Sequence, residues 1–532
     1  MRAFARQLAF LFLVLLILQQ GHICAQSPAL PSDFTLLSAI ESTLLDHPLI
    51  RSQHAQVQIS RGLQEQASGP FNSLITSGFN SNRIDVPLSG FQQQENTALG
   101  VTSSDQATNN TNYAVGVQRL FRDGISVNTQ FQLSRLTDNL FNKGGVNTST
   151  LNVALNIPLM RGRGRAVVAA QEQAAKTEVD ATLLDLNQLI SQLIANTASS
   201  YWSLVAARKN LAIAVEAEGR GSVYLHNVRE LVDADHVPSN DLHEVTANLA
   251  QRSSTRLAAE QQVVAAQEQL ALDMGMSADR MLAERPSPAD DFPRAEGQEL
   301  PSDTASCMEY YAEQALRRRA DYLASERRSA EAKTLLNATR NRLLPQVDLN
   351  FSAGYYGLRQ GRQAGDFFGS TYTGVPGPNA AAGITYSFPE NNQLARGELM
   401  QSQGLVIQAD VQSTQLARAI NSSVVVTLEG LRSAIVRAKR ARESVESFQS
   451  ALTGEREKYA GGIGSIVDIL SVEDRLTAAL SDQVESELAY ALAVTQFRFA
   501  TGTLVRPNEP VQSVPADTFF SLPFMCTLGG PR

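Results

Sequence analysis

Two hydrophobic patterns alternate along this chain and predict its helices and strands. Residues 166–221 and 391–457 contain no proline, and their apolar side chains recur at helical spacing. At about 1.5 Å per residue these stretches correspond to helices of roughly 80 to 100 Å. Their broad polar faces are typical of helices packed as coiled coils. A further helix is predicted over residues 36–67.

Shorter stretches alternate apolar and polar side chains with a period of two, within residues 70–158 and 345–389. Val127, Phe131 and Leu133 fall on one face of a predicted strand, while Asn128 and Gln130 fall on the other. A half-buried sheet of a soluble protein shows this alternation, and on alternation alone it is the preferred interpretation. A secreted chain with polar-faced strands also fits an outer-membrane barrel, whose signal per strand is weak.

The chain repeats its own plan. An offset of 227 residues takes Asp241 to Asp468 and Gly275 to Gly502. Proline-containing markers match at offsets of 231 and 275, so the first half holds 44 extra residues between them. Matches in the same order indicate an internal duplication. The predicted parts are a first repeat (33–284, with its tip near 233–241), a linker (285–304), a second repeat (305–503, with its tip near 459–468) and an irregular tail (504–532).

The start of the chain predicts export. Residues 1–25 have the charged start, short apolar run and small final residue of a signal peptide. Cys24 raises lipidation as an alternative, which the bulky Ile23 before it disfavours. No later segment is expected to reach the roughly 20 apolar residues of a membrane-spanning helix. Cys307 and Cys526 remain either as a disulfide or as separate thiols.

Composition and motifs exclude several functions. The net charge of −8 and the lack of a long basic tract argue against nucleic-acid binding. No Ser/His/Asp, Cys/His or paired-carboxylate arrangement stands out, so we expect no enzyme and no cofactor. A calcium loop from Asp233 to Glu244 would need an oxygen ligand and a glycine where Val237 and Pro238 stand. We therefore expect no metal site.

The segment from Tyr459 to Leu470 carries the most distinctive pattern. Glycines permit a tight turn between two helices, and a serine hydroxyl after them is suited to cap the second helix. The first repeat places a proline-containing turn at the equivalent position. The predicted turn residues are Gly461, Gly462, Gly464 and Ser465 in one tip, and Val237, Pro238 and Ser239 in the other.

Taken together, the chain resembles the TolC family of outer-membrane efflux proteins over residues 33–503. The resemblance rests on four groups of residues: Asp46-His47-Pro48-Leu49; Ile157 to Gly162; Tyr201-Trp202-Ser203-Leu204; and Tyr459, Gly462, Ser465, Asp468 and Leu470. It implies a mainly α fold with a membrane β-barrel part, in which a homotrimer completes the barrel and a coiled-coil α-helical barrel lies in the periplasm. It also implies an exit duct in the outer membrane that works with a periplasmic adaptor and an inner-membrane pump.

The resemblance also assigns roles. Asp468 would form an acidic ring at the periplasmic aperture, although a carboxylate at a helix start is also favoured by the helix dipole alone. Tyr459 and Asp241 would latch neighbouring hairpins, and the turn residues of both tips would dock the adaptor; a surface tyrosine and plain turn chemistry are the alternatives. Ser471 and Gly464 depart from the family, which has a second acid and an arginine there.

Two questions stay open at this level. Family members supply four strands each, and the extra residues around 113–118 and 124–136 form a further hairpin that either joins the barrel or projects beyond it. The exported substrate cannot be read, whether drug, metal or protein. A non-conducting coiled-coil or adhesion protein of the envelope is the alternative function, which the duplication and the strand blocks disfavour.

Overall fold

The computed structural model describes residues 33–234, 238–283, 285–295, 304–505 and 514–522. The predicted signal peptide, Cys24 and Cys526 lie outside these residues. The chain forms two compact units. The first comprises residues up to His47, 196–296 and 437–492, and the second comprises 48–195, 297–436 and the residues from 493 onward. Each unit is described by itself.

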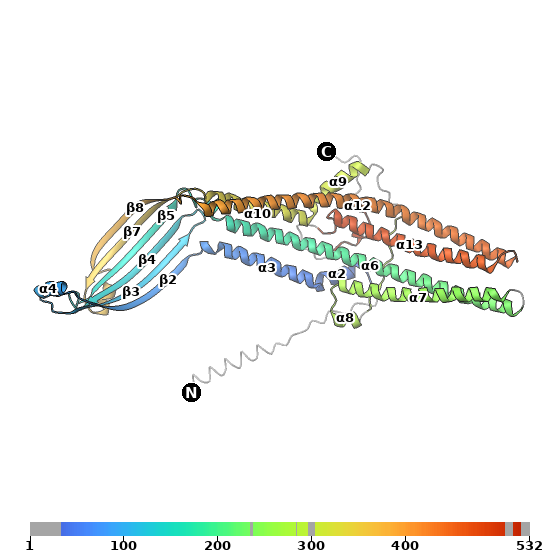
Figure 1. The fold of residues 1–532 in the computed structure, drawn as a ribbon, viewed down its shortest axis with the longest axis horizontal. Coiled ribbons are helices and arrows are strands. Elements are labelled where there is room, and N and C mark those ends of the chain that lie inside the picture. The colour runs from blue at the N-terminus through green and yellow to red at the C-terminus, as the bar shows by residue number, and fades with distance from the viewer. Residues whose placement is uncertain (1–32, 235–237, 284, 296–303, 506–513, 523–532) are drawn as a thin grey trace, which may run out of the picture. The chain divides into compact units, whose positions relative to one another are not determined.

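The second unit contains a six-stranded antiparallel sheet in the order β2-β3-β4-β5-β7-β8. Figure 1 shows these strands side by side, with β2 and β8 at the two edges. The sheet therefore includes the additional hairpin of the first half as part of one continuous ladder. The strands are β2 (Leu74–Pro87), β3 (Asp105–Leu120), β4 (Ser126–Asp138), β5 (Val146–Pro158), β7 (Gln346–Gln360) and β8 (Val375–Ser387).

In the half of this sheet nearest the helices the two faces differ in chemistry, because apolar and polar side chains alternate along the strands. One row of facing residues contains Val115, Phe131, Leu151 and Tyr355. The next row toward the helices contains Val117, Thr129, Val153 and Ala353. Rows on the opposite face carry amide and hydroxyl side chains, such as Thr76, Gln130, Asn152 and Asn379.

Two short helices interrupt the strand connections, and the sequence did not predict them. Helix α4 (Gly90–Ala98) joins β2 to β3 and begins with a capping box between Ser89 and Gln92. Helix α11 (Ala364–Gly369) lies between β7 and β8. Each is shorter than three turns, which leaves too few residues for a helical hydrophobic pattern to be read.

Long helices complete the second unit. Helix α10 (Ala320–Asn341) is tied to two others, α6 (Ala170–Asp233) and α12 (Gln393–Ala460). Arg328 of α10 donates to Glu178 of α6 at 3.2 Å and also pairs with Asp185. Lys333 of α10 lies 2.9 Å from Asp410 of α12. Other helices here are α3 (Pro48–Ser68), α5 (Arg165–Val168) and α9 (Thr304–Arg318).

The helix predicted over residues 36–67 is broken. Helix α2 (Leu36–Asp46) ends before His47, whose backbone is extended with φ −65° and ψ 122°. Proline lacks a backbone N–H and disfavours helical geometry in the residue before it, so α3 starts anew at Pro48. The predicted continuous helix was therefore wrong at this point.

The first unit holds the parts of two helical hairpins within residues 196–296 and 437–492, and an aromatic core. The first helical hairpin is α6 with α7 (Ser239–Asp273), and the second is α12 with α13 (Ile466–Ala500). Tyr201 and Trp202 of α6 are completely buried, and their rings meet edge to face with centroids 5.3 Å apart. Tyr201 also bonds Asp290 and the carbonyl of Phe34. The Tyr-Trp motif is therefore a core element.

The predicted linker and tail contain more structure than expected. A parallel pair of two-residue strands joins β1 (Asp33–Phe34) to β6 (Ser287–Pro288), and helix α8 (Ala278–Ala283) precedes it. In the tail, the 3-10 helix η2 (Ala516–Thr518) leads to the buried Phe519. Cys307 is disulfide-bonded.

One expectation about membrane spans needs correction. Helix α12 is long and apolar enough to cross a membrane by length and composition, with a best window of mean hydropathy 1.2 of which 28% is buried. Such a stretch was not expected after the N-terminal segment. Helix α12 exposes apolar side chains such as Val425, Val426 and Val436, and such exposed residues need a partner surface, which a lipid or a second protein would provide.

The ends of α7 and α13 lie at equivalent positions, separated by the 227-residue offset found in the sequence. Ser239 plus 227 is Ile466, and Asp273 plus 227 is Ala500, so α7 and α13 start and end at matching positions and both have 35 residues. Gly275 and Gly502, which follow them, both have positive φ, at 72° and 65°. These matches support the proposed duplication.

Candidate functional site at the helical tips

The second tip, residues 459–468, is a tight turn closed by backbone hydrogen bonds. Helix α12 ends at Ala460, and the amides of Ile463 and Gly464 both donate to the Lys458 carbonyl, at 3.0 and 3.2 Å. Gly462 sits in the left-handed region with φ 73°, which side chains with a Cβ rarely adopt. The glycine pattern in the sequence thus corresponds to a real conformational requirement at Gly462.

The start of α13 is capped from both directions. The Ser465 hydroxyl oxygen accepts the Val467 amide at 3.1 Å, and the Asp468 carboxylate accepts the Ser465 amide at 3.2 Å. These bonds satisfy donors that a helix start would otherwise leave unpaired. Asp468 therefore has a structural role in capping, while its side chain stays exposed.

The first tip, residues 233–241, is less fully described. Helix α6 ends at Asp233 and α7 begins at Ser239, with Pro238 in the capping position and no side-chain cap. Val237 lies outside the described residues. Asp241 is the third residue of α7, as Asp468 is the third residue of α13. The two acids thus occupy matching places in the two tips.

Above the tips, a buried cluster of charges joins the two hairpins. We call Arg220, Tyr224, Arg456 and Glu473 the Glu473 cluster. The Glu473 side chain on α13 is 0% exposed. Its Oε2 accepts from Nε of Arg220 at 2.8 Å, and its Oε1 accepts from Arg456 at 2.8 Å. One carboxylate therefore binds an arginine from each hairpin.

Tyr224 completes the cluster because its hydroxyl bonds both the Glu473 carboxylate and the Arg456 guanidinium. Its hydroxyl donates to Glu473 Oε1 at 3.0 Å and accepts from Arg456 at 3.0 Å. Burial raises the pKa of the Tyr224 hydroxyl, so this group remains a donor at neutral pH. Burial by itself would lower the pKa of Arg456, but the hydrogen bond that Arg456 donates to the Tyr224 oxygen and its attraction to Glu473 outweigh this effect and raise the pKa.

A second ion pair ties the hairpins together nearby. Arg252 of α7 is 7% exposed and donates to Asp474 of α13 at 2.9 Å. Its other terminal nitrogen donates to the Ala217 carbonyl of α6 at 2.9 Å. Asn248 also donates to Asp474, at 3.1 Å. Every helix of the two hairpins thus takes part in one of these two polar contacts.

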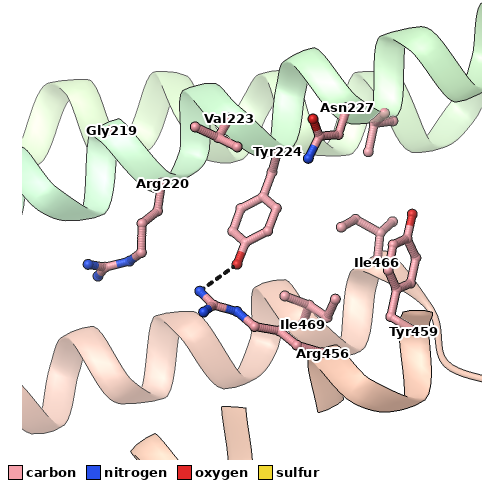
Figure 2. Close-up of a pocket in the computed structure, with 10 residues that line it drawn as sticks. Gly219, Arg220, Val223, Tyr224, Asn227, Arg456, Tyr459, Ile466 and Ile469 are labelled. Atoms are coloured by element: carbon pink, nitrogen blue, oxygen red, sulfur yellow. Dashed lines mark hydrogen bonds between the residues drawn. The ribbon is translucent and has the colours of Figure 1, made fainter. Parts of the chain in front are cut away.

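Beside the Glu473 cluster lies a hollow of about 440 Å³ between the hairpins. Figure 2 shows Tyr224 reaching from α6 to Arg456 on α12, with the ring of Tyr459 next to Ile466. Among the described residues, no hydrogen bond joins Tyr459 to Asp241. The predicted Tyr459–Asp241 latch is therefore not made within one copy of the chain, and it stays a prediction for an assembly.

Sequence reasoning missed the Glu473 cluster, although a signal was present. Ile466, Ile469, Leu470 and Leu476 form the apolar stripe of α13 and are buried. Glu473 lies within this stripe at helical spacing, where a charge is costly unless it is paired. An acid inside an apolar stripe predicts buried basic partners. Their identity could not be inferred, because they lie 253 and 17 residues away in the sequence.

Comparison with known proteins finds matches among solved structures only. No family model and no curated protein matches the sequence. Solved structures do match: the outer-membrane channel OprN aligns with 17% identity and a TM-score of 0.63, over 91% of this chain and 96% of that chain. CmeC of Campylobacter jejuni aligns with 14% sequence identity and a TM-score of 0.63, over 92% of both chains. The open state of MtrE of Neisseria gonorrhoeae aligns with 15% sequence identity and a TM-score of 0.60, over 89% of this chain and 91% of that chain.

The chain therefore has the fold of these outer-membrane channels. The predicted fold class, mainly α with a β part, is confirmed, and so is the resemblance to the TolC family at the level of fold. The roles of the tip residues are not decided by this likeness and are taken up as proposals.

Proposed function

We propose that this protein is an outer-membrane channel that serves as an exit duct for exported substrates. The observation that carries the proposal is the two-faced sheet of the second unit. Its apolar face exposes Ile75, Leu151, Val153, Phe351 and Ile384, as a lipid-facing barrel wall requires. Its opposite face carries amides and hydroxyls, which suit a water-filled lumen.

The assembly proposed for this duct is a homotrimer with its helical part in the periplasm. A six-stranded sheet cannot close alone, since the smallest membrane barrels have eight strands. The proposed partners are a periplasmic adaptor and an inner-membrane pump, with the adaptor docking on the tip residues Gly461, Gly462, Gly464, Ser465, Val237, Pro238 and Ser239. The described residues of this set lie beside the helix ends and are exposed, except Gly464, which is partly buried, and this supports the assignment.

The tips are proposed to form the gate. Three copies of Asp468 around an axis would concentrate negative potential and attract cations. Asp241 and Tyr459 would latch adjacent hairpins at this aperture. The Glu473 cluster and the Arg252–Asp474 pair support a closed resting state, because they hold the two hairpins of one copy together.

Conductance in a planar lipid bilayer tests the proposal. Purified protein should insert and give discrete conductance steps, which become larger when the tips are opened by mutation. A non-conducting envelope protein would give none in either form. The two-faced sheet disfavours that alternative, because a coiled coil needs no lipid-facing strands.

A further inference from the structure

Both edges of the six-stranded sheet are open. Every residue of β2 is exposed, and so is every residue of β8 except one that is partly covered. An edge strand presents a row of unpaired backbone groups, and each such group costs several kcal/mol in the hydrocarbon region of a membrane. These edges must therefore be paired with other strands wherever the sheet contacts lipid.

The β3–β4 hairpin belongs to the wall of the sheet. Val115 and Phe131 of this hairpin stand between Ser77 of β2 and Leu151 of β5, and Val117 pairs with Ile75 of β2. Apolar side chains thus continue across the hairpin in register with its neighbours. A hairpin that projected into water would have no reason to keep this alternation.

The base of the same hairpin is anchored to the helices of its unit. Arg122 in the β3–β4 turn pairs with Glu172 at the start of α6 at 2.6 Å, and its guanidinium lies over the ring of Phe71. The Asp123 carbonyl accepts the Gly164 amide at 3.0 Å. Gly124 approaches so closely that a Cβ there would lie 2.1 Å from the Gly162 carbonyl oxygen. These contacts place the turn at the base of the barrel wall.

We propose that each copy contributes all six strands, so that β2 of one copy pairs with β8 of the next and three copies close an 18-stranded barrel. The inference rests on the proposed trimeric channel and deepens it. Because six is an even number, β2 and β8 run in opposite directions, and their pairing continues the antiparallel ladder of the sheet. Barrel diameter grows roughly linearly with strand number, so this lumen is about one and a half times as wide as that of a 12-stranded barrel.

The composition of β8 locates the new contact. Pro376 and Pro378 lack amide donors and occupy the outer part of this edge strand, as prolines in sheets do. Hydrogen bonding to β2 is therefore expected along the inner part, from Ala380 to Ser387. The complementary part of the antiparallel β2 begins at Leu74.

Strand counting by electron cryo-microscopy of the full-length protein in lipid nanodiscs tests the proposal. The expected result is a threefold particle with 18 strands and with the β3–β4 hairpin in the wall. A conducting trimer with 12 wall strands and this hairpin outside would overturn the inference and leave the channel proposal standing. Particles without a closed barrel, together with no conductance, would overturn both.

Cysteine cross-linking gives an independent measurement on the same protein. Thr76→Cys on β2, combined in turn with Ala381→Cys, Gly383→Cys or Thr385→Cys on β8, should yield a covalent trimer upon oxidation in at least one combination. The control combines Thr76→Cys with Asn152→Cys, which lies on the same face in the middle of the sheet and cannot reach a neighbour's edge. Absence of trimer from all three edge pairs, or equal trimer from the control, contradicts the proposed pairing.

Discussion

The Glu473 carboxylate accepts a 2.8 Å hydrogen bond from Arg220, and this contact joins α13 of one helical hairpin to α6 of the other. Because Glu473 is completely buried, its charge is tolerated only while Arg220 and Arg456 neutralise it. In the proposed gate, this contact would link the closure of the tips to the integrity of one ion cluster.

Glu473→Gln should loosen this link. The amide keeps the shape but leaves two arginines without their anion, and losing one member of a buried pair costs about 3 kcal/mol. We expect a lower melting temperature and a larger single-channel conductance. The matched control is Glu457→Gln, an exposed position on α12. If the two variants conduct equally, the Glu473 cluster does not hold the tips closed.

Replacing Tyr459 or Asp241 by alanine tests the proposed latch between copies. A hydroxyl-to-carboxylate hydrogen bond contributes about 1 to 2 kcal/mol. Its loss should raise the conductance and increase the sensitivity of cells to large antibiotics that leak inward. Conductance that stays at the wild-type value in both variants would remove the latch from the account.

Asp468→Asn tests the acidic ring. An asparagine oxygen can still accept the Ser465 amide, so the helix cap survives while three charges are removed from the aperture. We expect a lower cation selectivity and weaker block by divalent cations. Asp482→Asn, an exposed position further along α13, should leave both properties unchanged. Equal block in the two variants would argue for a capping role alone.

Gly462→Ala tests the turn geometry of the second tip. Alanine at a φ of 73° costs about 1 to 2 kcal/mol, whereas Gly461 has no such requirement and lies only in ordinary contact with its surroundings. Amide hydrogen exchange between residues 459 and 468 should therefore become faster in Gly462→Ala and remain near wild type in Gly461→Ala. The same exchange rate in both variants would show that the turn is not strained by a side chain.

The stability of the second unit should depend on pH through Glu331. Burial, together with the nearby charge of Glu178, raises the pKa of Glu331 from 4.5 to about 7. A folded-state pKa above the unfolded value means that the protonated carboxyl contributes stability, which is complete below about pH 4.5 and is lost as the pH rises through 7.

Glu331→Gln should therefore melt at a higher temperature than wild type at pH 8, and the difference should vanish at pH 4. The exposed Glu309→Gln is the control, and its melting temperature should follow wild type at both pH values. A constant difference between Glu331→Gln and wild type across this range would contradict the raised pKa.

Local patterns allowed much of the fold to be predicted from the sequence. Period-two alternation found strands such as β4 and β5, and the 227-residue offset related α7 to α13, because both signals lie within short stretches of chain. The helical pattern over residues 36–67 did not predict the break at His47–Pro48, although the sequence places a proline there. Glu473 pairs with Arg220 across 253 residues, and only the packing of two hairpins brings them together. The tip turn could be predicted because a turn with positive φ favours glycine, and Gly462 takes this role.

Single-channel conductance of the purified protein in a planar lipid bilayer tests the central claim most directly. The account predicts discrete conductance steps for the wild type, and larger steps for Glu473→Gln and for the Tyr459→Ala or Asp241→Ala variants. No conductance from any of these proteins, despite insertion into the bilayer, would contradict the assignment as an outer-membrane channel.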